Sequence, residues 1–153
     1  MSRFSERGGW WVAGQFALLA MIVASPSRSK ASALAPIFHW MGAVLLSFSA
    51  GILATGSLKL GKRLTPFPRP SENSSLETTG IYRHVRHPLY LGVILAAFGI
   101  ASLKMNPWSL LLSAALAALL NAKAEREEAW LSEKFPGYRA YRLISAKFIP
   151  FLF

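Results

Sequence analysis

Cysteine is absent from this chain of 153 residues, so disulfides, thiolate metal ligands and a cysteine nucleophile are all excluded. Acidic side chains are scarce as well, because 7 aspartate and glutamate residues stand against 17 lysine and arginine residues. Nothing in the sequence resembles a Gly-rich phosphate loop, which removes the usual sequence support for a dinucleotide site. We expect no metal centre.

The abundant residues are apolar. Hydrophobic residues make up 53% of the chain and the mean hydropathy is +0.35, which is too apolar for an ordinary soluble domain. The net charge of +10 would suit a nucleic-acid-binding protein, but the basic residues lie between long apolar stretches rather than on one polar face. A membrane protein that faces an anionic leaflet explains them better, and we expect no nucleic-acid partner.

Four apolar stretches predict an all-α integral membrane protein with about four transmembrane helices in a single domain, residues 1–153. The second stretch exceeds the roughly 20 residues that a spanning helix needs, whereas the third and fourth reach only about 24 Å of a core of about 30 Å. Asn106 and Pro107 predict a tight turn that makes the last two a compact C-terminal hairpin. The predicted spans are about 10–25, 33–58, 88–103 and 107–122.

The first stretch has an alternative interpretation as a cleaved signal peptide, because Arg3 and Arg7 precede it and small residues follow it. Cleavage would leave three spans and disturb the distribution of charge. With four spans, 14 of the 17 lysine and arginine residues fall in the N-terminus, the loop 59–87 and the tail 123–153. The positive-inside rule then predicts that both termini, the loop and the tail are cytoplasmic.

Small residues in the second stretch predict how that helix packs. Ser47, Gly51 and Thr55 recur every four residues, a stripe typical of membrane helices that approach one another closely. We therefore expect this stripe to face a neighbouring helix.

A basic and aromatic cluster stands where the predicted loop meets the third stretch. Pro88 fixes the start of a helix, so Arg83, Arg86 and His87 surround an N-terminus whose free N–H groups and dipole favour anions. A carboxylate or phosphate pocket would explain polar groups in this costly position. Snorkelling arginines are the alternative, but they do not explain two histidines or Tyr90 one turn inside the helix.

An acidic cluster lies on the fourth helix, which we expect to leave the membrane as one rod because no helix breaker intervenes between Pro107 and Phe135. Glu128 falls inside an apolar stripe of this helix and Glu127 on its edge, so they require a cationic partner or several donors. The alternative is a solvated face on which Lys123 pairs with Glu127. The stripe consists of Leu120, Ala124, Leu131 and Phe135.

These two clusters, in this order and separated by a helical hairpin, resemble the isoprenylcysteine carboxyl methyltransferase family and its phospholipid methyltransferase relatives. The resemblance covers roughly residues 64–150, and the run LTPFPRP is similar to small bacterial members. One position departs from the family pattern, since Ile144 stands where an arginine is expected. The matching motifs are RHPLYLG (Arg86 to Gly92), EEAWL (Glu127 to Leu131), FPGYRAY (Phe135 to Tyr141) and KFIP (Lys147 to Pro150).

The resemblance implies an S-adenosylmethionine-dependent methyltransferase of a bacterial inner membrane, with its cofactor between the hairpin and an amphipathic cytosolic tail. Its acceptor would be a membrane lipid or a lipidated small molecule, such as the carboxylate of an isoprenylcysteine. His87 and the helix N-terminus would hold the cofactor's carboxylate, and Arg142 or Arg139 would orient the acceptor. Tyr82, Tyr90, Tyr138 or Trp130 would cover adenine or the sulfonium. The implied cofactor-binding residues are Tyr82, Arg83, Arg86, His87, Tyr90, Glu127 and Glu128, and the implied catalytic residues are Glu127, Glu128 and Arg142.

Several alternatives stay open at this point. A phospholipid amine or a small thiol could be the acceptor, and an amine would also need a base, for which Glu127 and Glu128 are the candidates. A non-enzymatic membrane protein that retains the fold, or an NADPH-dependent membrane reductase, would be a protein of another class. The sequence leaves the oligomeric state open.

Overall fold

The computed structural model describes residues 8–28, 33–68 and 75–149, and this part of the chain is helical without a strand. The all-α prediction is confirmed there. A single parallel bridge joins Val85 to Ala146. The α-helices are α2 (Gly9–Ala24), α3 (Ala35–Leu60), α4 (Pro88–Lys104), α5 (Pro107–Lys134) and α6 (Tyr138–Ile144), and two short 3-10 helices are η1 (Gly61–Arg63) and η2 (Gly80–Arg83).

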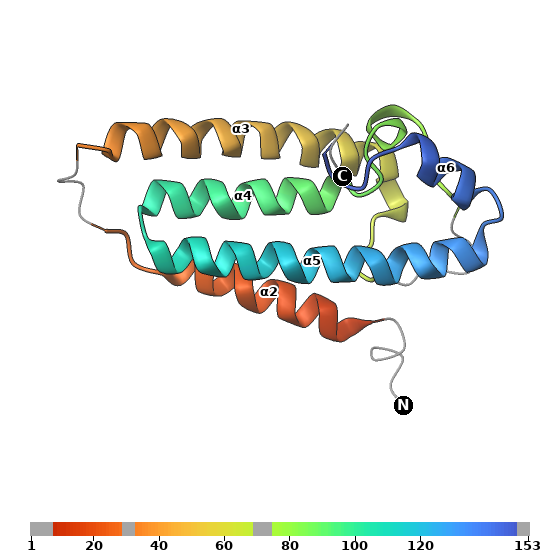
Figure 1. The fold of residues 1–153 in the computed structure, drawn as a ribbon, viewed down its shortest axis with the longest axis horizontal. Coiled ribbons are helices and arrows are strands. Elements are labelled where there is room, and N and C mark those ends of the chain that lie inside the picture. The colour runs from red at the N-terminus through yellow and green to blue at the C-terminus, as the bar shows by residue number, and fades with distance from the viewer. Residues whose placement is uncertain (1–7, 29–32, 69–74, 150–153) are drawn as a thin grey trace.

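The four long helices lie side by side in a bundle (Figure 1). Helix α4 contacts both α3 and α5, and α2 packs mainly on α5. The centre of the core is formed by Ile22, Ala97, Leu116 and Leu120, which are fully buried. Helix α5 extends beyond the N-terminal end of α4, and α6 gathers there with the segment that precedes α4 (Figure 1). This end of the bundle holds the candidate site.

The hairpin of α4 and α5 is confirmed. Met105 takes a left-handed conformation with a φ of 51°, the Asn106 side chain accepts a hydrogen bond from the backbone N–H of Trp108, and Pro107 is the first residue of α5. The fourth helix also continues unbroken to Lys134, as the lack of helix breakers predicted. The opposite end of the bundle is held together by the Lys104 ammonium, which donates to the carbonyl of Val23 at 2.8 Å.

Close packing of α3 on α4 depends on small residues seven positions apart. A Cβ added to Gly42 would lie 2.8 Å from the carbonyl oxygen of Gly99, and one added to Gly92 would lie 2.6 Å from Leu53. Between these points the Ser49 hydroxyl donates to the carbonyl of Gly92 at 2.8 Å. The two backbones therefore approach too closely for larger side chains.

The predicted stripe of Ser47, Gly51 and Thr55 is wrong as the packing face. All three residues are exposed and line a shallow hollow on the outer side of α3. A spacing of four advances about 40° around a helix at each step, whereas a spacing of seven drifts by only about 20°. A heptad row therefore stays on α4 along the full length of α3, and a row of every fourth residue does not.

Two helices, α3 and α5, are long and apolar enough to cross a membrane. Helices α2 and α4 are apolar but shorter, with 16 and 17 residues. The four apolar segments are thus present as helices, and the prediction that all four span the bilayer is not confirmed by their lengths.

Candidate active site

A cavity of about 160 Å³ opens at the end of the bundle where α6 and η2 meet α4 and α5. It is lined by side chains from five helices and from the segments on either side of residues 69–74. Polar and apolar groups both contribute, so the cavity suits a ligand with both characters. Its polar lining residues include Tyr82, Arg86, His87, Tyr90, Glu127 and Tyr138, and its apolar ones include Leu60, Phe67, Leu76, Leu89 and Leu131.

Behind the lining, the Glu128 carboxylate contacts the side chains of Arg86, His87 and Arg142. Its Oε1 lies 2.8 Å from Arg86 Nε and 3.2 Å from His87 Nε2, and its Oε2 lies 3.4 Å from Arg142 Nε. The Glu128 residue is only 4% exposed. A buried carboxylate is stable only with partners of this kind, which explains how an acidic residue fits on the apolar stripe of α5.

Arg86 also fastens the segment after α6 to the start of α4. Its Nη1 donates to the carbonyl oxygen of Arg142 at 3.1 Å and to that of Ser145. The Arg86 backbone N–H donates to the carbonyl of Ala146 at 2.8 Å, beside the bridge of Val85. Two segments some 60 positions apart in sequence are therefore held as one wall of the site.

His87 lies between the two carboxylates. Its Nε2 contacts Glu128, and its Nδ1 lies 3.8 Å from Glu127 Oε2. The ring stacks on Tyr90 with a centroid distance of 5.3 Å and an interplanar angle of 7°, and the Tyr90 hydroxyl donates to Glu127 Oε2 at 2.6 Å. The ring of His87 is thus fixed by contacts on its edge and on its face.

Two tyrosine hydroxyls in the cavity have no hydrogen-bond partner among the described residues. They belong to Tyr82 and Tyr138, both of which are buried. Burial, reinforced by Glu127 near Tyr82 and by Glu128 near Tyr138, raises the pKa of each phenol well above its usual value, so both remain neutral donors. A buried hydroxyl without a partner costs about 1–3 kcal/mol, which favours a ligand that satisfies it.

The predicted site residues take different places. Tyr82, Arg86, His87, Tyr90 and Glu127 line the cavity. The other three do not. Glu128 lies behind Arg86 and His87. Arg142 contacts Glu128, but its side chain is 61% exposed. Arg83 is exposed and lies outside the lining. Trp130, proposed as a cover for the cofactor, instead packs against the guanidinium of Arg126 at 5.1 Å.

Sequence reasoning missed the environment of Lys123. This side chain is fully buried, and its ammonium donates to Gln15 Oε1 at 2.8 Å and lies 4.9 Å from the centroid of the Tyr90 ring. The alternative of a solvated face with a Lys123–Glu127 pair is therefore wrong. One signal was available, because a single glutamine in the first apolar stretch requires a polar partner.

Comparison with protein families decides the relationship. A family model described as phospholipid methyltransferase matches residues 37–137, about two thirds of the chain. The chain belongs to the phospholipid methyltransferase family. A search among curated proteins found no significant match. The matched region contains the motifs of Arg86 to Gly92 and Glu127 to Leu131, while α2 lies outside it. Together with the two long apolar helices, membership of this family supports a membrane protein with methyltransferase chemistry.

Proposed function

We propose that the chain is an S-adenosylmethionine-dependent methyltransferase that acts on a lipid-like or lipidated acceptor at the boundary of membrane and cytosol. The observation that carries this proposal is the cavity in which the hydroxyls of Tyr82 and Tyr138 have no hydrogen-bond partner among the described residues and lie beside charged groups of both signs. Family membership supplies the reaction class. When bound, the cofactor would supply an electrophilic methyl group on a sulfonium.

The residues present fit such a zwitterionic cofactor. The hydroxyls of Tyr82 and Tyr138 can hydrogen-bond its polar groups, and aromatic ring faces attract a sulfonium through cation–π interaction. Glu127 can accept from an ammonium or from ribose hydroxyls. Arg86 and His87 present cationic or donor groups to a carboxylate, and Glu128 holds both in position.

The acceptor requires an apolar path to the same cavity. Such a path is lined by Leu60 at the end of α3, by Leu76 in the segment before η2 and by Leu89 in α4. An apolar path of this kind suits an acyl or prenyl chain. A carboxylate acceptor, as in isoprenylcysteine, needs no base, so its reaction would depend on orientation and on exclusion of water in the cavity. Orientation of this kind is worth about 7–11 kcal/mol.

A phospholipid amine is the second candidate acceptor, and the position of Glu127 favours it. An amine must lose a proton in order to be methylated, and Glu127 brings a carboxylate to the cavity with a side chain that remains 25% exposed. In that case Glu127 would accept the proton that the amine loses on methylation.

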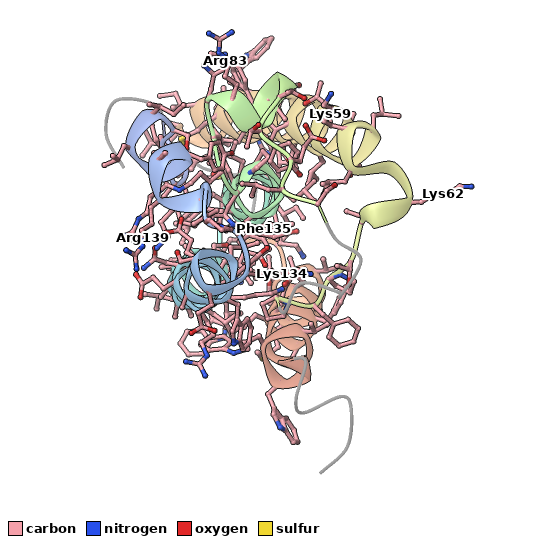
Figure 2. All side chains as sticks on the ribbon, turned by 90° about the vertical axis from the view of Figure 1, so that its right-hand side faces the viewer. Lys59, Lys62, Arg83, Lys134, Phe135 and Arg139 are labelled. Atoms are coloured by element: carbon pink, nitrogen blue, oxygen red, sulfur yellow. The ribbon has the colours of Figure 1, made fainter. Side chains whose placement is uncertain are left out.

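The topology that fits this function has four spans, with both termini and the site on the cytoplasmic side of a bacterial inner membrane. Figure 2 views the site end and shows Lys62, Arg83 and Arg139 projecting outward around it. Basic residues concentrate at cytoplasmic membrane surfaces. The shorter helices α2 and α4 would be about 24 and 26 Å long, so the bilayer would thin locally around them.

The test is a binding and transfer assay on protein reconstituted in nanodiscs. Titration with S-adenosylmethionine and with NADPH separates a methyltransferase from a reductase and from a protein that binds neither. Transfer of a labelled methyl group to phosphatidylethanolamine, a prenylcysteine analogue or a small thiol then identifies the acceptor. Binding of NADPH alone, or of neither compound, would overturn the proposal.

Paired tyrosine variants locate the cofactor. Tyr82→Phe and Tyr138→Phe remove hydroxyls that have no partner in the part of the chain that the structure describes, so the unliganded protein should keep its stability while affinity for S-adenosylmethionine falls about tenfold for each. Tyr141→Phe is the matched control, because its hydroxyl already donates to the carbonyl of Tyr82. That variant should lose about 1 kcal/mol of stability and much less affinity. Thermal denaturation and calorimetric titration measure both quantities.

A further inference from the structure

The outer face of α6 exposes aliphatic side chains that no described residue covers. Leu143 is 88% exposed and Ile144 is 78% exposed, and Leu143 is the most exposed large hydrophobic side chain in the described part of the chain. The inner face of the same helix carries Tyr138 and Tyr141, which are buried and line the cavity. Helix α6 thus has one side in the candidate site and an apolar side directed away from it.

Basic side chains accompany this apolar face. Arg139 and Arg142 are exposed on α6, and together with Leu143 they line a hollow beside the site. Arg139 points outward at the end of the bundle, where Lys62 and Arg83 also project (Figure 2). Exposed aliphatic groups beside cationic groups match the chemistry of an anionic lipid surface, with acyl chains below and phosphates above.

The position of α6 is fixed by the rest of the protein. A helix of 7 residues has little stability alone, but Arg86 binds the carbonyl oxygens at its C-terminal end, and Tyr141 donates to the carbonyl of Tyr82. The outer face is therefore presented at one level of the molecule, at the same end of the bundle as Lys59 in the last turn of α3 and Lys62 in η1. A helix held there lies where a bilayer crossed by α3 would have its headgroups.

We propose that α6 seats in the anionic headgroup layer of the bilayer, with Leu143 and Ile144 reaching the acyl boundary and Arg139 contacting phosphate. The partner is the anionic lipid surface itself. This position of α6 would set the depth in the bilayer at which the cavity, on the other face of α6, meets a lipid acceptor. The inference uses the membrane location of the chain and does not depend on methyl transfer.

The lack of cysteine makes site-specific labelling direct. Nitroxide labels at Leu143→Cys and Ile144→Cys, in nanodiscs of phosphatidylcholine and phosphatidylglycerol, should be relaxed more by oxygen, which partitions into lipid, than by a water-soluble nickel chelate. A label at Glu133→Cys, an exposed acidic position at the end of α5, is the matched control and should show the reverse. Equal access of nickel to all three labels would overturn the proposal. So would spin–spin broadening that disappears on dilution with unlabelled protein, because a second copy would then cover the face.

The electrostatic part has a separate readout. For the Leu143→Cys label, the immersion depth should decrease when phosphatidylglycerol is left out or when salt is raised, because salt screens exposed charges. In Leu143→Cys/Arg139→Gln this dependence on lipid charge should be reduced, and in Leu143→Cys/Glu133→Gln it should persist. A depth that does not respond to lipid charge in any variant would contradict the role of Arg139. Methyl transfer measured on the same samples separates failure of this seat from failure of the proposed function.

Discussion

At the scale of single residues, Glu128 has the largest structural role in the site. One carboxylate holds Arg86, His87 and Arg142, and through Arg86 it also holds the chain that follows α6. A buried carboxylate that contacts two guanidinium groups and an imidazole is a unit whose parts cannot be removed singly without cost. Its removal should therefore affect folding and activity together.

Glu128→Gln keeps the shape of the side chain and removes its charge, leaving the buried guanidinium of Arg86 without its counterion. We expect a loss of about 3–5 kcal/mol of stability and strongly reduced methyl transfer. Glu125→Gln and Glu133→Gln are controls, since both glutamates are exposed and the buried Lys147, which contacts Glu125, also donates to Asn121 Oδ1 at 2.6 Å. They should change stability by less than about 0.5 kcal/mol. Urea denaturation and turnover are the measurements, and equally small effects at all three positions would contradict the proposed network.

Glu127→Gln tests the acceptor. An amide oxygen can still accept from the Tyr90 hydroxyl, so stability should change little. Because an amide is no base, transfer to an amine should fall about 10²–10⁴-fold, whereas transfer to a carboxylate should fall far less. Turnover with phosphatidylethanolamine and with a prenylcysteine analogue gives the comparison. An equal loss with both acceptors would remove Glu127 as a base and leave it a binding role.

At the scale of helices, local signals in the sequence located the elements well. Pro88 and Pro107 begin α4 and α5, and the absence of a helix breaker predicted that α5 would continue past the membrane. Which faces meet was not predictable to the same degree, since it depends on partners distant in sequence. For this reason the stripe of Ser47, Gly51 and Thr55 does not pack on α4 as its small residues suggest, but lies on the exposed side of α3. The contact of Arg86 with the chain after α6 was likewise not predictable, because its partners are distant in sequence.

Helix α2 lies outside the region that matches the family, yet it completes the surroundings of the site. Gln15 accepts from the buried ammonium of Lys123, which lies over the ring of Tyr90. The surroundings of the Tyr90 ring therefore depend on α2, a helix outside the region that the family model matches. Nothing local in the sequence pairs Gln15 with Lys123, because the two residues are 108 positions apart.

A double-mutant cycle measures this link. Gln15→Leu leaves a buried ammonium without its acceptor and should cost about 1.5–3 kcal/mol or more. Lys123→Met in the same background removes the ammonium as well, so much of the lost stability should return. Chemical denaturation of the two single variants and the double variant gives the coupling energy. Additive losses would show that the two side chains do not act as a pair.

At the scale of the whole molecule, the distribution of charge predicts the orientation of the bundle. With four spans, 14 of the 17 lysine and arginine residues lie on the side of the termini and of the loop 59–87, and the candidate site lies at that end. Reporter fusions at residue 153 and in the connection between α2 and α3 should therefore be active on opposite faces, the first in the cytoplasm and the second outside. Moving the charge is the control, because added lysines in the connection between α2 and α3 should weaken or reverse this pattern. A fusion at residue 153 that is active only on the outer face would overturn the topology, and the proposed site could then not draw its cofactor from the cytosol.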